Sequence, residues 1–155
     1  MTHPLPLLRQ REIEAGVIAP LVAAFAAEVG ADRAREIAAG VIKGLAREGG
    51  CAAASALGGN GLGELKRAVE RGTEGGALEI DVLRDDGTAF EFNVTRCRYA
   101  EMYRRLGLEE LGPVLSCNRD AAMIEGFNPD IAFRRTQTLM EGAAYCDFRY
   151  RSSGT

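Results

Sequence analysis

The feature that most constrains the fold of this chain is a change in the spacing of its apolar residues near position 77. Before it, Ile13, Val17, Leu21 and Phe25 recur every four residues up to Gly30, which predicts a helix. Pro20 interrupts this row, so the helix either kinks or begins there. A second helical row follows Asp32, a suitable N-cap, and consists of Ala34, Ile37, Ala38, Val41, Ile42 and Leu45. We expect both rows to face the core.

Two glycine clusters follow the second row. Gly49-Gly50 and the run 58–61 bracket a stretch of small residues around Cys51. This pattern favours a loop, either a lid over a site or a plain connection, over a weak helix. It is not a dinucleotide-binding fingerprint, because no strand precedes it. Leu62, Leu65 and Val69 then predict a short third helix ending at Gly72.

After position 77 the apolar residues alternate with polar ones, which is typical of strands. Leu78, Ile80 and Val82 form one such segment and Phe90, Phe92 and Val94 the next. A three-residue loop, Asp85-Asp86-Gly87 with Gly87 left-handed, would pair Val82 with Phe90 and Ile80 with Phe92. The resulting hairpin has one apolar face, which the N-terminal helices can cover.

The last third of the chain predicts two more helices and a second hairpin. One helix runs from Cys97 to Gly107, and another begins near Pro113 and ends at Gly126. On the latter, Val114, Cys117, Ala121 and Ile124 share a stripe, and Asp120 neighbours Cys117 one turn later.

A two-residue turn at Glu141-Gly142 would close the second hairpin. It pairs Phe133 with Tyr150 and places Arg135 and Gln137 on the apolar face beside Cys146. A buried arginine needs a partner. Arg135 therefore meets an internal carboxylate (Asp120 or Glu101), awaits an anionic ligand, or extends past the sheet edge.

These patterns predict one α+β domain over residues 1–155, with N-terminal helices packed on an antiparallel sheet of about four strands. Its two hairpins are separated by a helical segment. We expect a flexible leader over 1–12, a helical part over 13–72 and the motif-bearing part over 77–151. A net charge of −3 argues against nucleic acid as partner, and no apolar run of membrane-spanning length or signal peptide is evident. We therefore expect a cytoplasmic protein with free thiols.

The chemistry available to the chain centres on its cysteines. The only histidine, His3, lies in the leader, which argues against serine–histidine hydrolysis and histidine-rich zinc sites. Three of the four cysteines have a carboxylate close by in sequence: Cys97 with Glu101, Cys117 with Asp120, and Cys146 with Asp147. Thiolates and carboxylates are therefore the expected catalytic groups.

Four segments together resemble the L-2-amino-thiazoline-4-carboxylic acid hydrolase family. They are Arg96-Cys97-Arg98-Tyr99-Ala100-Glu101, Leu115-Ser116-Cys117-Asn118-Arg119-Asp120, the hairpin arm from Arg135-Thr136-Gln137 to Glu141-Gly142, and Cys146-Asp147-Phe148-Arg149-Tyr150. The resemblance covers roughly residues 77–151. It implies hydrolytic opening of a small carboxylated heterocycle. In the reaction of the family's name, the ring carbon between sulfur and nitrogen takes up water and a carbamoyl-cysteine results.

For such a reaction we expect a thiolate or an activated water to attack the ring carbon. Cys117 is the first candidate nucleophile because Asp120 can shuttle protons for it, with Cys97 as its rival and Cys146 in support. Because a carboxylate raises the pKa of a thiol, Arg135 or a helix N-terminus must offset Asp120. Arg135 would also clamp the substrate carboxylate.

The remaining candidate substrate-binding residues are Gln137 and Thr136, which would hold the ring nitrogen, together with Glu101 and Asp147. No cofactor is expected. The alternative is zinc, held by Cys97, Cys117, Cys146 and Asp120. A second alternative is a non-enzymatic module that binds a small ligand or metal in the same pocket, and a third is a helper subunit. The cysteines could also be structural. The substrate, the nucleophile, the first bond broken and homo-oligomerisation stay open.

Overall fold

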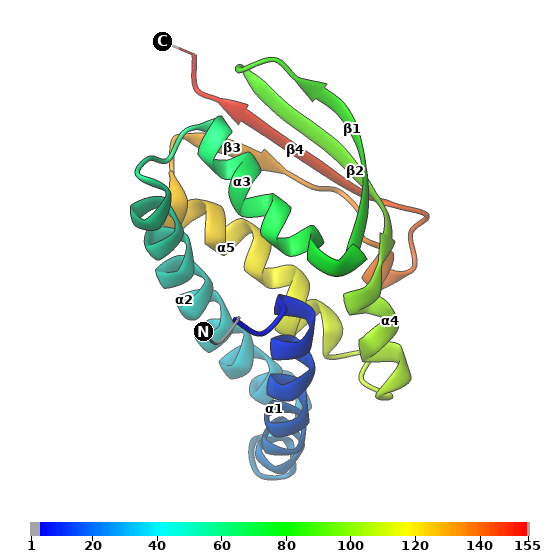
Figure 1. Ribbon diagram of the computed structural model, residues 1–155. Helices are drawn as coiled ribbons and strands as arrows, with labels where there is room; N and C mark the ends of the chain where they lie inside the picture. Colours follow the sequence, from blue (N-terminus) through cyan, green and yellow to red (C-terminus); the bar gives the residue numbers. More distant parts are fainter. Residues whose placement is uncertain (1–3, 155) are drawn as a thin grey trace.

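The computed structural model describes residues 4–154 and has the expected α+β architecture (Figure 1). Within that range four strands form one antiparallel sheet in the order β1-β2-β4-β3. The elements are α1 (Leu7–Val29), α2 (Ala31–Leu57), α3 (Leu62–Thr73), η1 (Glu74–Gly76), β1 (Leu78–Asp85), β2 (Ala89–Cys97), α4 (Arg98–Arg105), η2 (Pro113–Cys117), α5 (Asn118–Phe127), β3 (Ile131–Arg134), η3 (Leu139–Glu141) and β4 (Cys146–Ser152). Among residues 4–154, no helix has both the length and the apolar character needed to cross a membrane.

Helix α1 begins at Leu7, inside the segment that we expected to be a leader, and continues through Pro20. His3, which we expected in the leader, lies outside the described residues. Ion pairs attach the first half of α1 to the body of the molecule: Glu12 binds Arg105 at 2.7 Å, and Glu14 binds Arg119 at 3.1 Å. These ion pairs explain why the polar beginning of α1 is helical, although the sequence pattern alone does not predict a helix there.

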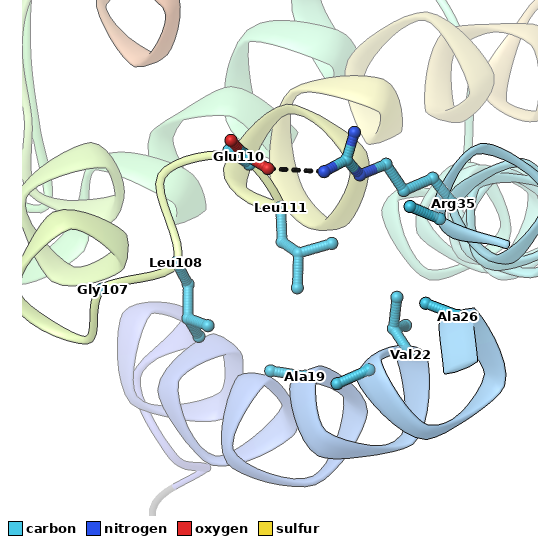
Figure 2. A pocket seen from close by; sticks show the side chains of 10 residues that line it. Ala19, Val22, Ala26, Arg35, Gly107, Leu108, Glu110 and Leu111 are labelled. Carbon is cyan, nitrogen blue, oxygen red and sulfur yellow. Dashed lines mark hydrogen bonds and ion pairs between the residues drawn. The ribbon is translucent and has the colours of Figure 1, made fainter.

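The expectation that the N-terminal apolar rows face the core is wrong for the row on α1, and on α2 it holds only for Ala34 and Ile42, which are buried. On α1, Ile13, Val17, Leu21 and Phe25 are exposed, and on α2 so are Ile37, Val41 and Leu45. Smaller side chains of these helices face inward instead, including Ala15, Val22 and Ala34. Figure 1 shows the α1–α2 turn at the end of the molecule remote from the sheet. There α1, the start of α2 and the segment 107–111 enclose a hollow of about 280 Å³, shown in Figure 2.

The expected loop around Cys51 is also wrong, because α2 continues through Gly49-Gly50 to Leu57. The glycines serve close packing of α2 on α5. A Cβ on Gly50 would overlap the carbonyl oxygen of Met123 and lie 2.8 Å from the nitrogen of Phe127. A Cβ on Gly126 would overlap the backbone of Arg47 in the same way. Glycine is used here for a helix–helix contact and not for a turn.

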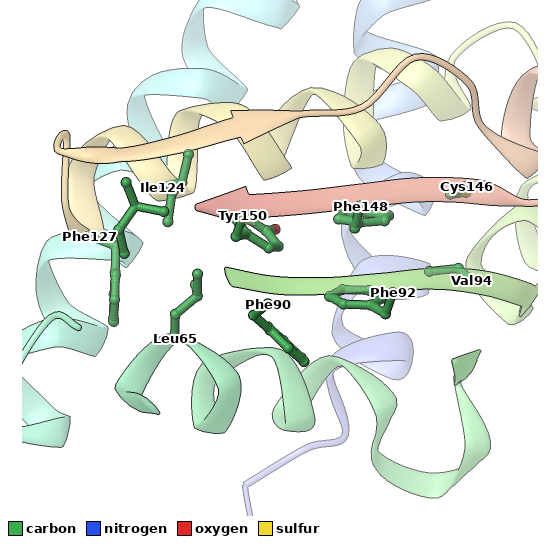
Figure 3. Close-up of a cluster of buried hydrophobic side chains, with 10 residues drawn as sticks. Leu65, Phe90, Phe92, Val94, Ile124, Phe127, Cys146, Phe148 and Tyr150 are labelled. Carbon is green, nitrogen blue, oxygen red and sulfur yellow. The ribbon is translucent and has the colours of Figure 1, made fainter. Parts of the chain in front are cut away.

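The main core lies between the sheet and the helices α3 and α5. Phe90 and Phe92 of β2 and Phe148 and Tyr150 of β4 form its aromatic layer, with ring centroids of Phe92 and Phe148 5.0 Å apart. Figure 3 shows Leu65 of α3 and Ile124 and Phe127 of α5 pointing into this layer. A second cluster, which includes Ala15, Ile42, Tyr103 and Leu115, joins α1, α2 and α4 to η2.

The first hairpin has the predicted parity but a different register. Val82 pairs with Phe92 and Ile80 with Val94, two residues from the expected partners. The connection at 86–88 has Gly87 at φ 82°, left-handed as predicted. One irregularity, between Val82 and Arg84, leaves Leu83 of β1 without a partner, and another, opposite Glu79 and Ile80, leaves Thr95 of β2 without one. The apolar face is preserved because a shift of two residues keeps side chains on the same side.

The final hairpin has the predicted pairing of Phe133 with Tyr150, but the predicted two-residue turn is wrong. β3 ends at Arg134, and an irregular segment containing η3 leads to β4. Asp147 accounts for the early departure, because it accepts hydrogen bonds from the backbone N–H groups of Thr136 (2.8 Å) and Gln137 (3.0 Å). These N–H groups are thereby satisfied without a strand partner.

Candidate functional site

Four chain segments bring the candidate catalytic residues to the contact between helix and sheet. Cys97 is the last residue of β2, and its sulfur accepts the N–H of Ala100 (3.4 Å) as the N-cap of α4. Cys117 ends η2, a π-turn that leads into α5, where Asp120 lies in the first turn. Cys146 begins β4, and its sulfur accepts the N–H of Leu139 (3.2 Å). π-turns of this kind are frequent at functional sites.

The centre of the cluster is an ion pair between Asp120 and Arg135. Arg135 also donates from Nη2 to the carbonyl oxygen of Cys117 (3.2 Å), and its guanidinium lies 5.5 Å from the ring centroid of Phe148. Its side chain is 17% exposed and that of Asp120 34% exposed. The buried arginine is thus paired with an internal carboxylate. Asp120 is one of the partners that the predicted position of Arg135 on the apolar face suggested.

Burial and the ion pair act in opposite directions on Asp120. Burial raises its pKa to about 6, whereas the charge and hydrogen bond of Arg135 lower it. A third of the side chain is still exposed, although the carboxyl group itself is desolvated. A carboxylate with a pKa near neutrality and access to solvent is suited to general base catalysis.

The three thiols of the cluster are held in the neutral form. Burial, followed by the charge of Asp120, raises the pKa of Cys117 to about 12, with Arg135 opposing. Burial raises the pKa of Cys97 to about 11 and also raises that of Cys146. Each thiol is affected by the charges of the other groups, which places them in one electrostatic neighbourhood. The offset that a resting thiolate at Cys117 requires is therefore not supplied by Arg135.

Several predicted substrate-binding residues lie apart from this cluster. Glu101 is on the surface and binds Arg96 at 2.9 Å. Asp147 accepts the hydroxyl of Thr136 (2.6 Å) as well as backbone N–H groups, so the two residues stabilise the segment after β3. Gln137 donates its amide to the carbonyl oxygen of Tyr145 (2.9 Å). Because the strand ends before Gln137, the parity that placed it beside Cys146 does not apply.

The alternative zinc site does not gather in space. Within residues 4–154, no three or more Cys, His, Asp or Glu side chains converge as a metal-binding group. Cys97, Cys117, Cys146 and Asp120 affect one another's pKa values, but they do not form a tetrahedral ligand set. The fourth cysteine, Cys51, lies elsewhere on α2 and donates to the carbonyl oxygen of Gly126 (3.1 Å).

Two further residues border the cluster, and the sequence pattern did not identify them as candidate site residues. Tyr150 is fully buried in β4, and its phenol is affected by the charges of Asp120 and Arg135. Arg119 donates to the carbonyl oxygen of Leu115 (2.7 Å) and its charge lowers the pKa of Asp120. Figure 3 shows Cys146, Phe148 and Tyr150 in one row along β4. That alternation is visible in the sequence, but it marks Tyr150 only as a core residue.

The fold and the cluster define a class of protein: an α+β domain with a carboxylate, a guanidinium and neutral thiols where helix meets sheet. The family model described as L-2-amino-thiazoline-4-carboxylic acid hydrolase matches residues 10–150, and the chain belongs to this family. The match confirms the resemblance and extends it into the helical half. The family takes its name from a hydrolase. A comparison with curated proteins found no match.

Proposed function

We propose that the protein is a hydrolase that opens a small carboxylated heterocycle, a cyclic amidine such as L-2-amino-thiazoline-4-carboxylate. The observation that carries the proposal is the pair of Asp120 and Arg135, a partly exposed carboxylate with a raised pKa beside a cation. Membership of a family named after this reaction supports it. A ring carbon between two heteroatoms needs a base for the attacking group and an acid for the leaving group, and one carboxyl can serve in turn as both.

In the proposed reaction, ionised Asp120 removes a proton from a water molecule, whose oxygen bonds to the ring carbon between sulfur and nitrogen. As the carbon–oxygen bond forms, the electron pair of the carbon–nitrogen double bond moves to nitrogen. This pair re-forms the double bond as the carbon–sulfur bond breaks with its electron pair going to sulfur. Protonated Asp120 returns the proton to the sulfur, so that the carboxylate is regenerated. The hydroxyl proton moves to the nitrogen, which leaves a carbon–oxygen double bond. The sum is the addition of one water, giving a carbamoyl-cysteine from the thiazoline.

Arg135 orients Asp120 in this scheme and binds the substrate. Among the described residues it uses one N–H group toward Asp120 and one toward the carbonyl oxygen of Cys117. A guanidinium has five N–H donors, so others remain for a substrate carboxylate. The neutral thiols of Cys117 and Cys97 line the same neighbourhood. Direct attack by Cys117 is the competing route, and it would need Asp120 to remove the thiol proton during the attack.

Mass spectrometry of L-2-amino-thiazoline-4-carboxylate incubated with the purified protein tests the proposal. We expect a product heavier by one water, lost in Asp120→Asn and retained in Asp81→Asn, a matched change at an exposed position of β1. Calorimetric titration with the same compound provides the second readout. Binding without a hydrated product would contradict the hydrolase and favour a binding module that uses the same residues.

A further inference from the structure

Helix α1 carries an apolar row that nothing in the described chain covers. Ile13, Val17, Leu21, Phe25 and Val29 lie four residues apart and are 48–60% exposed. Between Glu14 and Glu28 the helix has no charged or polar side chain. A helix that is apolar on all sides normally lies inside a protein, and monomers rarely expose contiguous apolar surface on this scale.

The adjoining helix α2 repeats the arrangement. Ile37, Val41 and Leu45 are 46–60% exposed, whereas the buried positions of the same helix are the small residues Ala34, Ala46 and Gly50 together with Ile42. Burial of apolar area drives folding, so a helix that faces mostly small residues inward and most of its large ones outward leaves much of its hydrophobic contribution unused. The two helices pack against each other, so both rows belong to one helical pair.

The exposed area matches what an interface requires. The two rows contain eight large side chains, each about half exposed. At roughly 100 Å² of exposed surface per side chain they offer about 800 Å², which is the contribution of one partner to an interface of standard size. The row on α1 alone is about 24 Å long, since it spans 16 residues at 1.5 Å each.

The shape of α1 favours a second copy of the same chain as the partner. Beside the row of large residues runs a parallel row of small exposed ones, Gly16, Pro20 and Ala24. A ridge and a groove that both follow the four-residue spacing are the elements of the commonest helix packing, with axes crossing at about −50°. Because ridge and groove lie on one helix, two copies related by a twofold axis can fill each other's groove.

We propose that the exposed rows of α1 and α2 form a homodimer interface, with the twofold axis near Leu21, the middle residue of the α1 row. The apolar segment between Glu14 and Glu28 contains no lysine or arginine, whereas a membrane-binding helix carries these residues on its polar face, and this disfavours an anionic membrane as the occupant. The first half of α1 is attached to the body by its ion pairs, so the exposed half is presented on a fixed support.

Sedimentation equilibrium tests the interface, with Leu21→Glu as the variant and Leu83→Glu as its matched control. Leu83 is a half-exposed leucine on β1, outside both rows. We expect the wild type and Leu83→Glu to have twice the chain mass of 16.6 kDa at micromolar concentration. Leu21→Glu places two carboxylates together at the axis and should raise the dissociation constant at least about 100-fold. Circular dichroism should show the same helix content in all three, because position 21 is exposed within one chain.

Cross-linking provides an independent measurement. In a Cys51→Ser background, which removes the exposed thiol, Leu21→Cys should form a disulfide between copies on mild oxidation, and Leu83→Cys should not. A wild type that stays monomeric up to about 100 µM would overturn the interface, whether or not it binds to vesicles of anionic phospholipid. An unchanged dissociation constant in Leu21→Glu would also overturn it.

Discussion

The pH dependence of turnover tests whether Asp120 or a resting thiolate begins the reaction. We expect kcat/KM to rise with an apparent pKa near 6 and to level off above about pH 7, because Asp120 must be ionised to accept a proton. At pH 7 a carboxyl whose pKa is about 6 is ionised in a ratio of about ten to one. A thiol whose pKa is about 12, as for Cys117, is ionised in roughly one molecule in 10⁵.

The variants of Arg135 identify the group responsible. The guanidinium lowers the pKa of Asp120 against the effect of burial. Its removal in Arg135→Gln should therefore move the ascending limb to higher pH, whereas Arg135→Lys keeps the charge and should leave the limb near its original place. A general structural weakening would lower the rate without moving the limb.

The assay is the initial rate of product formation between about pH 5 and about pH 9, in buffers of constant ionic strength. A rate that continues to climb above about pH 9 would refute the argument and indicate a thiolate nucleophile. A limb that stays in place in Arg135→Gln would show that the titrating group is not Asp120.

Three further predictions concern single positions. Asp120→Asn should lower kcat at least about 100-fold and Cys117→Ala less than about 10-fold, as measured by steady-state kinetics. Gly50→Ala should destabilise the protein by about 2 kcal/mol through overlap with α5, and Gly49→Ala, which meets nothing within 4 Å, should stabilise it by about 0.5–1 kcal/mol in urea denaturation. Asp147→Asn should lower the melting temperature at neutral pH but abolish much of the loss of stability in acid.

The sign of the last prediction follows from the pKa of Asp147. Burial raises this pKa, but the hydrogen bonds from Thr136 and Gln137 lower it by more. The carboxylate therefore stabilises the fold above the pKa of the unfolded chain, and this contribution is lost as the pH falls through the lower folded value. Equal acid sensitivity of the wild type and Asp147→Asn would contradict this sign.

The other two predictions can fail as follows. A loss of kcat in Cys117→Ala as large as in Asp120→Asn would indicate thiol attack. Equal stability of the two glycine variants would contradict the close contact of α2 with α5.

Local spacing predicted the elements better than their partners. The α+β class, the left-handed Gly87 and the pairing of Phe133 with Tyr150 all follow from alternation and turn chemistry over short distances. The prediction of a loop at Gly49-Gly50 was wrong because glycine serves either a turn or a close helix–helix contact. Only the position of α5 shows that close packing applies here. The register of β1 failed because a bulge depends on the neighbouring strand.

In the candidate site, too, the contacts between residues close in sequence were easier to predict than the contacts between distant ones. Cys117 and Asp120 are neighbours on one helix, and their spacing shows it. Asp120 was one of the partners expected for Arg135, because its predicted place on the apolar face of the sheet required a partner for a buried charge. The separation of Glu101 from Cys97 could not be predicted, because Cys97 turns inward as a helix cap while Glu101 finds Arg96 on the surface.

Periodicity identifies residues that share a face, but it does not say what covers that face. The rows of α1 and α2 were expected in the core because a hydrophobic stripe on a helix normally faces it. In the structure the core side of α2 is formed partly by Ala46 and Gly50, whose small size lets α5 approach closely. Helices that pack so closely leave little room for large side chains between them, so that Ile42 is buried but Val41 and Leu45 lie outside. The two rows are exposed in a single chain, but they are buried in the assembled protein if a second copy covers them.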